Sequence, residues 1–524
     1  HPLPPQVVDP EAADHREAAA EAVDSLQRKS AVAIDSYQPF HCETIQSLGI
    51  TQIHTTMRKQ LITSLLCGIG LVAMAQGEYD ALKYSQGELL GTARYMGMAG
   101  AFGALGADMS AIHQNPAGIG LYRSSELSLT PVLSLGNVNA NYNGTTVNNS
   151  KMTLQLNSGG YIGSFRPSNS TNVSNINFAV TYNKVKDFNR IVGIKDYNKP
   201  VSLLDPITTA AGTTAPANLS GLSYLAWETY LINQENAGHY TNMLGPGETV
   251  NPTMYMKEEG GIGELDLTIG ANWAHFMYLG LGIGFQSVDY RLTSSYAETS
   301  SGYETFDPIY FDLRNAVATT GSGVNVKLGA IIKPFSFLRF GFALHSPTYY
   351  SLTDAFGTSL TSEGVDPNNV RATAEFSEET SSYELTVPGK MSYSLAYLFG
   401  QKGLISFDCE VVDYREMGLR DINGFPYDDT NASINNHMQT VYNMKLGGEY
   451  RITDNLSLRA GTAWFGAAYR DNMTADNTYV RAVGTTPHYA FDKGSRYYTG
   501  GLGYRNGAFF MDAAIANQQL TEDI

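Results

Sequence analysis

The stretch Glu264–Phe285 reads ELDLTIGANWAHFMYLGLGIGF and alternates between two kinds of residue. Leu265, Leu267 and Ile269 fall on one face, whereas polar residues and glycine fall on the other. The alternation breaks at 274–276 and then resumes. A period of two is that of a β-strand with one face in an apolar medium and the other in a polar one. The stretch therefore predicts a hairpin of two half-apolar strands.

The same pattern predicts thirteen strands. Most are longer than a globular strand of about 5–6 residues and are close to a tilted membrane strand of about 9–11. Short connections such as 334–336 alternate with the long connections 187–262, 291–322, 348–387, 416–437 and 469–495. This alternation is typical of an all-β protein, a transmembrane antiparallel β-barrel. The predicted strands are 126–138, 154–165, 175–186, 263–274, 277–290, 323–333, 337–347, 388–399, 403–415, 438–452, 456–468, 496–505 and 508–517.

The composition excludes several other classes. The chain has 524 residues, of which 16% are charged and 52 are glycine, and its net charge is −16. It has no run of 18 apolar residues, so a helical membrane bundle is excluded. The negative charge argues against a nucleic-acid partner. Three scattered cysteines predict neither a disulfide framework nor a metal site.

The number of predicted strands is odd, whereas single-chain bacterial barrels close with an even number. By parity the thirteenth strand runs outward. We therefore expect a last loop and a fourteenth, inward strand beyond residue 524, so that the barrel (126–524) is truncated at its C-terminus.

A secretory signal peptide is predicted at 57–75, MRKQLITSLLCGIGLVAMA. Its basic start, its apolar centre and the small-residue site Ala73–Ala75 agree with this interpretation. A buried helix is the alternative. Because such a signal acts at an N-terminus, we expect residues 1–56 to be a non-native upstream segment.

Residues 76–125 predict a compact plug inside the barrel. Gly97, Gly100, Gly103 and Gly106 recur every three residues, which is not the G-x-G-x-x-G spacing of a nucleotide loop. A flexible linker is the alternative, but it would leave neighbouring apolar residues such as Phe102 unburied.

The segment GTARYMGMAGAFGALGADMSAIHQNPAGIG (Gly91–Gly120) resembles the N-terminal hatch of the FadL-type outer-membrane transporters of long-chain fatty acids and other hydrophobic compounds. The tripeptide Asn115–Ala117 matches the hatch motif of that family. The resemblance implies a fourteen-stranded barrel of the bacterial outer membrane. An apolar ligand would enter its lumen and leave sideways through a gap in the wall when the hatch moves. The implied hatch and gating residues are Asn115, Pro116, Ala117, Gly100, Gly103, Gly106 and Phe102.

The hatch motif also has a local physical interpretation. Pro116 fixes its own φ and disfavours helix at Asn115, whose side chain can bond to its own backbone in a turn. A plain structural turn is thus the alternative to a gating role.

Two further sites are predicted outside the hatch. In the family a kinked third strand opens the wall, but the corresponding strand here lacks glycine and proline. Gly159 and Gly160 in the second strand are the candidate wall opening, because glycine weakens a strand. In the loop 187–262, a short helix with an apolar side is a candidate for external ligand capture, and a helix packed on the barrel rim is the alternative. The residues of that apolar side are Leu222, Leu225, Trp227 and Tyr230.

No catalytic motif is present: the sequence lacks G-x-S-x-G, H-E-x-x-H, a Walker loop and C-x-x-C. Asp408 and Glu410 are predicted to be ordinary polar lining of the lumen. We therefore expect no enzyme activity, no catalytic residue, no metal and no cofactor.

The leading hypothesis is passive outer-membrane transport of hydrophobic small molecules such as long-chain fatty acids. The alternative is a FadL-like barrel that acts as a binding or assembly partner in protein secretion or surface attachment. The expected partners are the hydrophobic ligand, outer-membrane lipid and lipopolysaccharide, and the chain is expected to be a monomer.

Overall fold

The computed structural model describes residues 77–167, 172–235, 238–245, 247–301, 309–365, 372–376, 379–470 and 491–523. The expected upstream segment (1–56) and signal peptide (57–75) lie outside these residues. Within them, no helix has both the length and the apolar character needed to cross a membrane.

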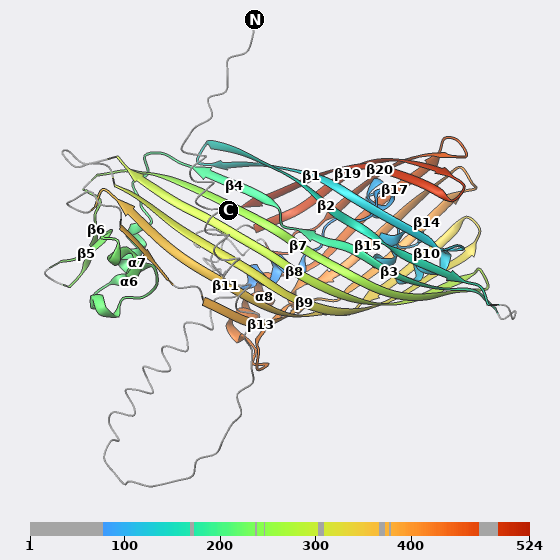
Figure 1. Cartoon of the computed structure of the whole chain (residues 1–524), viewed down its shortest axis with the longest axis horizontal. Helices are drawn as coiled ribbons and strands as arrows, with labels where there is room; N and C mark the ends of the chain where they lie inside the picture. The colour runs from blue at the N-terminus through green and yellow to red at the C-terminus, as the bar shows by residue number, and fades with distance from the viewer. Residues whose placement is uncertain are drawn as a thin grey trace, which may run out of the picture. The chain divides into compact units, whose positions relative to one another are not determined.

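An eighteen-stranded antiparallel sheet forms the wall of the barrel (Figure 1). Its strands are β1 (Glu126–Tyr142), β2 (Thr145–Phe165), β3 (Val173–Asp187), β4 (Arg190–Lys195), β7 (Val250–Trp273), β8 (Met277–Ser300), β9 (Tyr310–Phe335), β10 (Leu338–His345), β11 (Thr348–Glu363), β12 (Ala372–Glu375), β13 (Glu379–Val387), β14 (Lys390–Phe399), β15 (Gly403–Asp413), β16 (Gly418–Asp421), β17 (Thr440–Arg451), β18 (Leu456–Phe465), β19 (Phe491–Asn506) and β20 (Phe509–Asp523).

The remaining elements lie in the lumen and the long loops. The helices are α3 (Glu78–Ser85), α4 (Ala93–Gly97), α5 (Met109–Gln114), α6 (Leu204–Ala211), α7 (Gly221–Glu228) and α8 (Asp428–His437). Short 3-10 helices are η2 (Pro116–Leu121), η3 (Pro216–Asn218) and η4 (Tyr414–Glu416), and β5 (Ile232–Gln234) pairs with β6 (Tyr240–Asn242).

Within the described residues the chain runs thirteen times from one end of the barrel to the other, at the thirteen predicted places. Four crossings consist of two consecutive strands with a short break between them: β3 with β4, β10 with β11, β13 with β14, and β15 with β16. Each crossing pairs antiparallel with the next. The predicted antiparallel barrel is confirmed.

The first and last crossings, β1 and β20, therefore run in the same direction. Within the described residues no ladder joins them. The expected fourteenth strand stays a prediction.

The strands are longer than predicted on the side of the long loops. The predicted loops 291–322 and 348–387 consist mostly of strand, because β8 continues to Ser300 and β11 pairs with both β9 and β13. The prediction followed the apolar alternation, which ends where the strands leave the apolar medium. The backbone ladder continues beyond that point.

The outward face of the wall is apolar and exposed. Leu267, Ile269 and Phe285 are 44%, 53% and 48% exposed. Such a band is stable in lipid, where a β-barrel satisfies the hydrogen bonds of its backbone internally. The wall therefore suits a lipid bilayer, and in outer-membrane barrels the short turns face the periplasm.

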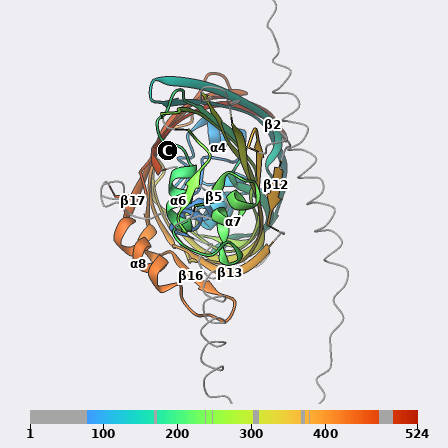
Figure 2. The ribbon, with the colours of Figure 1, turned by 90° about the vertical axis from the view of Figure 1, so that its left-hand side faces the viewer.

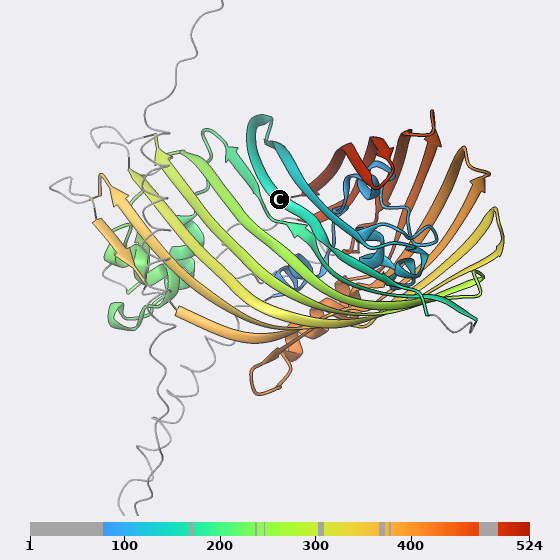
Figure 3. The same cartoon turned by 45° about the vertical axis from the view of Figure 1, so that its right-hand side comes forward.

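The hatch, residues 77–122, packs inside the lumen (Figure 3). Met98, Phe102 and Ile112 are at most 1% exposed. The segment is thus a compact plug and not a flexible linker.

Candidate functional site: the hatch and its seat

The Asn115–Ala117 tripeptide forms the predicted turn at the start of η2. Asn115 Oδ1 accepts a hydrogen bond of 3.1 Å from the Ala117 N–H. Its Nδ2 donates to the Gly103 carbonyl oxygen at 2.7 Å. Asn115 therefore closes its own turn and also fastens it to the glycine-rich loop of the hatch.

This turn rests on glycines of the wall. Gly280 of β8 pairs with Gly329 of β9, and a Cβ at either position would overlap the Asn115–Ala117 turn. A Cβ at Gly270 of β7 would likewise overlap the Ile119 side chain. We call Gly270, Gly280 and Gly329 the glycine seat. Sequence reasoning missed it, although its signal is the glycine that replaces polar residues on the inward face at 280, 282 and 284.

The other predicted hatch residues form its packing. Gly100 and Gly106 have φ of 73° and 58°, a left-handed conformation that glycine adopts most easily. The Gly103 N–H donates to Asp408 Oδ2 at 2.9 Å, and the Phe102 ring lies 5.7 Å from that of Tyr95. Asp408 thus anchors the hatch to β15.

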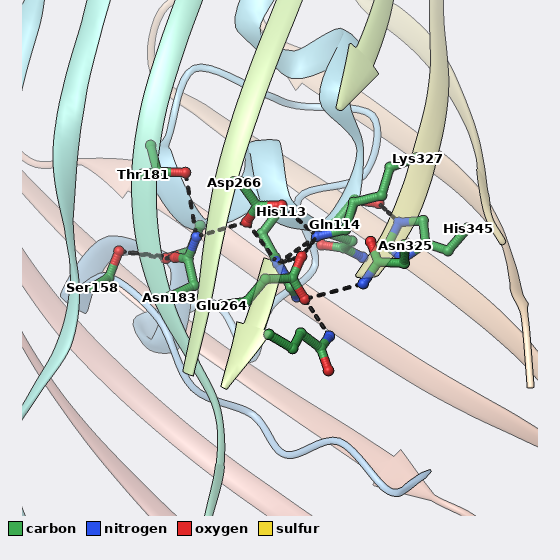
Figure 4. Close-up of polar contacts among 12 residues, drawn as sticks. His113, Gln114, Ser158, Thr181, Asn183, Glu264, Asp266, Asn325, Lys327 and His345 are labelled. Carbon is green, nitrogen blue, oxygen red and sulfur yellow. Dashed lines mark hydrogen bonds and ion pairs between the residues drawn. The ribbon is translucent and has the colours of Figure 1, made fainter. Parts of the chain in front are cut away.

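A polar node joins the hatch to the wall (Figure 4). It consists of His113 from α5, Glu264 and Asp266 from β7, and Lys327 from β9. Lys327 Nζ lies 2.6 Å from Asp266 Oδ1 and 2.8 Å from His113 Nδ1, and it also pairs with Glu264. His113 Nδ1 lies 3.0 Å from Asp266 Oδ2. The two carboxylates and the ammonium group are almost fully buried.

Hydrogen bonds extend the polar node along the wall (Figure 4). Asn183 of β3 donates to Asp266 at 3.4 Å and accepts from Ser158 of β2 at 2.9 Å. Ser110 of the hatch also donates to Asn183 Oδ1, at 3.1 Å. One network therefore connects the hatch with β2, β3, β7 and β9.

Ligand atoms of His113, Glu264 and Asp266 lie within 4.8 Å of one another, a spacing that suits a metal ion. The Lys327 ammonium already lies among them and balances one carboxylate. Burial and Lys327 favour the neutral imidazole, but the nearby carboxylates outweigh them and raise the pKa of His113 above its ordinary value. The arrangement is a buried salt-bridge network whose charge the protein itself supplies.

The ladder between β2 and β3 stops beside the hatch. Its last pair is Ser158 with Asn183, and Gly159 and Gly160 lie inside it, paired with β1 and β3. The two predicted opening residues are therefore fully paired, and the part of β2 that pairs with β1 but has no ladder to β3 lies just before them.

Beyond that point, side chains bridge the two strands. Gln155 Nε2 donates to Asp187 Oδ2 at 2.6 Å, and Lys184 donates to Gln155 Oε1. We call this part of the wall, between residues 145–157 of β2 and residues 184–195, the seam.

A cavity of about 2020 Å³ lies between the hatch, the seam-side strand β4 and the strands β1 and β20, and it includes the space between β1 and β20, which no ladder joins in the described residues. Its outer end reaches Phe188, whose ring lies 5.0 Å from Tyr290 and 6.0 Å from Tyr84 of α3. Aromatic groups that pack edge-on in this way form an apolar cluster, which here is buried. The cavity thus extends along the hatch to the Phe188 side of this cluster.

Glu88 lines the same cavity between α3 and α4. Its Oε2 accepts a hydrogen bond of 3.2 Å from the Asp187 N–H. Burial raises the pKa of Glu88 to about 7, although the Lys186 ammonium acts in the opposite direction.

Docking of the segment 77–92 is therefore expected to weaken as pH rises. The docked carboxyl holds its proton to higher pH than a solvated one does, so stability is lost between about pH 4.5 and 7, by at most about 3 kcal/mol. Hydrogen exchange of this segment, corrected for intrinsic pH dependence, should show less protection at pH 8 than at pH 5.5. Glu88→Gln should protect equally at both values, and a persistent pH difference in that variant would contradict the assignment.

The candidate capture residues lie at the barrel end that carries the long loops (Figure 2). Leu225 is fully buried in a cluster with Phe311 and Leu360 of the wall strands, and Trp227 and Leu222 pack partly against this cluster. Tyr230 is 51% exposed. The helix α7 thus packs on the rim, and the four residues do not form one exposed surface.

Comparisons with known proteins bear on the fold. No family model and no curated protein matches the sequence. A Pseudomonas aeruginosa FadL homologue of known structure is 15% identical, with 83% of this chain and 91% of that chain covered and a TM-score of 0.46. The chain is similar in fold to the FadL-type channels. CymD, a monoaromatic hydrocarbon channel, is 10% identical (83% and 94% covered, TM-score 0.44). The Pseudomonas putida toluene transporter TodX is 12% identical (82% and 93% covered, TM-score 0.44).

Proposed function

We propose that this chain is a passive, hatch-gated transporter of hydrophobic small molecules across the outer membrane. The observation that carries the proposal is the cavity that runs along the hatch to Phe188, against which Tyr84 and Tyr290 pack. Ligand sites are typically concave and mostly apolar, with a few polar groups. The part of this cavity near Phe188 suits an apolar compound, such as a fatty acid or an aromatic hydrocarbon, whereas the rest of its lining also carries charged side chains such as Arg94 and Asp187.

In this proposal the ligand leaves through the seam into the membrane. Backbone ladders hold the rest of the described wall between β2 and β20, whereas side chains hold the seam. The seam opens in this proposal when Gln155, Lys184 and Asp187 rotate and Lys151 releases Glu258 and Glu259, and no ladder breaks. The proposed opening therefore lies at residues 145–157, just before the candidate residues Gly159 and Gly160.

Hatch movement would open the seam through the polar node. Ser110 of the hatch and Ser158 of β2 both donate to Asn183, at the last pair of the β2–β3 ladder. A displaced hatch withdraws one donor from that point. The Asn115–Ala117 turn on the glycine seat is the part of the hatch that must leave first.

A disulfide between the hatch and the wall tests the gating. A Cβ at Gly103 would lie 3.0 Å from Ser394 Cβ, slightly closer than the usual disulfide separation of about 3.5–4.5 Å. In a Cys409→Ser background, Gly103→Cys with Ser394→Cys should reduce uptake of labelled oleate or toluene at least about tenfold when oxidised. Reduction should restore it.

The two single-cysteine variants are the controls, and each should transport equally under both conditions. Normal uptake by a barrel with a verified cross-link would refute hatch gating. Absence of uptake in the reduced form and in the parent barrel would refute transport of these compounds. Mass spectrometry of molecules that co-purify in mild detergent would then identify the ligand class.

A further inference from the structure

The periplasmic end of the barrel carries a charge opposite to that of the whole chain. The short turns and strand ends there comprise 123–126, 166–167, 273–277, 333–339, 399–403, 451–456 and 505–509, which we call the short-turn rim. Its acidic residues are Glu126 and Asp454, whereas its basic residues are Arg123, Arg166, Lys333, Arg339, Lys402, Arg451 and Arg505. The rim is thus strongly basic in a chain of net charge −16.

These cations are available for an external anion. Arg166, Lys402 and Arg451 are exposed, as are Arg123 and Arg505. None of the seven forms an ion pair with a described residue, whereas the cations of the lumen, such as Lys327 and Arg459, are paired. Arg339 differs from them, because its guanidinium is turned toward the hatch and donates to the Leu105 carbonyl oxygen at 2.9 Å.

Exposed aromatic side chains alternate with the cations. Phe165, Tyr450 and Tyr504 are 63%, 57% and 45% exposed, and each directly precedes an arginine. Phe335 and Phe337 stack at 5.3 Å between Lys333 and Arg339. Aromatic residues of this kind form the belt at a membrane–water interface. The basic groups therefore lie at the level of the lipid headgroups.

We propose that the short-turn rim binds anionic phospholipid headgroups in the periplasmic leaflet of the outer membrane. The aromatic rings rest at the boundary of the hydrocarbon, and the arginines that follow them reach the lipid phosphates. Arginine matches a phosphate with paired hydrogen bonds. Arg451 and Arg505 also border the cavity, but lipid binding at the rim does not depend on what the barrel transports.

Native mass spectrometry of the delipidated full chain tests the proposal. The barrel in detergent is offered equal amounts of phosphatidylglycerol and phosphatidylcholine. A basic residue near an anionic surface contributes about 1 kcal/mol, or about fivefold in binding. We therefore expect at least a tenfold preference for phosphatidylglycerol. The variant Arg166→Gln, Arg451→Gln, Arg505→Gln should reduce the preference to within about twofold.

The matched control removes three basic residues from the opposite end: Lys195→Gln, Arg291→Gln, Arg420→Gln. It should retain the preference. Equal binding of the two lipids by the unaltered barrel, or an equal loss in the control, would overturn the proposal. A salt titration of the unaltered barrel gives a second readout, because the preference should weaken as NaCl screens the charges. A preference independent of salt would also overturn it.

Discussion

Replacing Lys327 with methionine should lower the free energy of unfolding by about 3–5 kcal/mol, the usual loss when one partner of a buried ion pair is removed. The ammonium lies 2.6 Å from Asp266 Oδ1 and also pairs with Glu264, and its side chain is 2% exposed. Methionine keeps most of the volume but leaves the two carboxylates without their cation. Urea titration of the barrel in lipid vesicles would measure the loss.

A control and a rescue separate charge from packing. Lys257→Met removes an exposed pair with Glu259, in which the lysine side chain is 41% exposed, and should change stability by less than about 1 kcal/mol. Adding Glu264→Gln and Asp266→Asn to Lys327→Met should recover part of the loss, because neutral amides cost less to bury than carboxylates. A loss below about 1 kcal/mol in Lys327→Met would show that the polar node does not hold the wall and hatch together.

Replacing Gly280 with alanine should dislodge the hatch from its seat. The new Cβ would overlap the backbone of Pro116, and backbone cannot rotate away as a side chain can. Overpacking of this kind costs about 1–3 kcal/mol. We expect faster hydrogen exchange in 109–121 and a leak of hydrophilic antibiotics into cells, because the plug no longer closes the lumen.

Gly136→Ala is the matched control, since a Cβ at Gly136 would have no neighbour nearer than 3.8 Å. It should leave both hydrogen exchange and antibiotic sensitivity unchanged. Unaltered exchange at 109–121 in Gly280→Ala would mean that the wall yields instead of the hatch, and the glycine seat would then have no gating role.

The sequence predicted the wall because each strand carries its own evidence. The alternation of Leu265, Leu267 and Ile269 is local, and the bilayer that it fits is the same for every strand. The turn at Asn115–Ala117 is local too, since a proline and an asparagine restrict the backbone beside them. Such local features can be predicted without knowing which strand lies next to which.

Only the tertiary structure decided what the hatch touches. In the register of the sheet, Thr268 pairs with Gly282, and Gly282 pairs with Lys327. Because Gly282 has no side chain, the Lys327 side chain reaches across it toward Asp266 and forms the polar node. The glycine seat and the end of the β2–β3 ladder at Ser158 depend on strand register in the same way. Register is a relation between distant segments, and a shift of one residue moves every side chain to the other face. The sequence by itself therefore determined a membrane barrel with a glycine-rich plug, and the pairing of its strands decided the node, the seat and the seam.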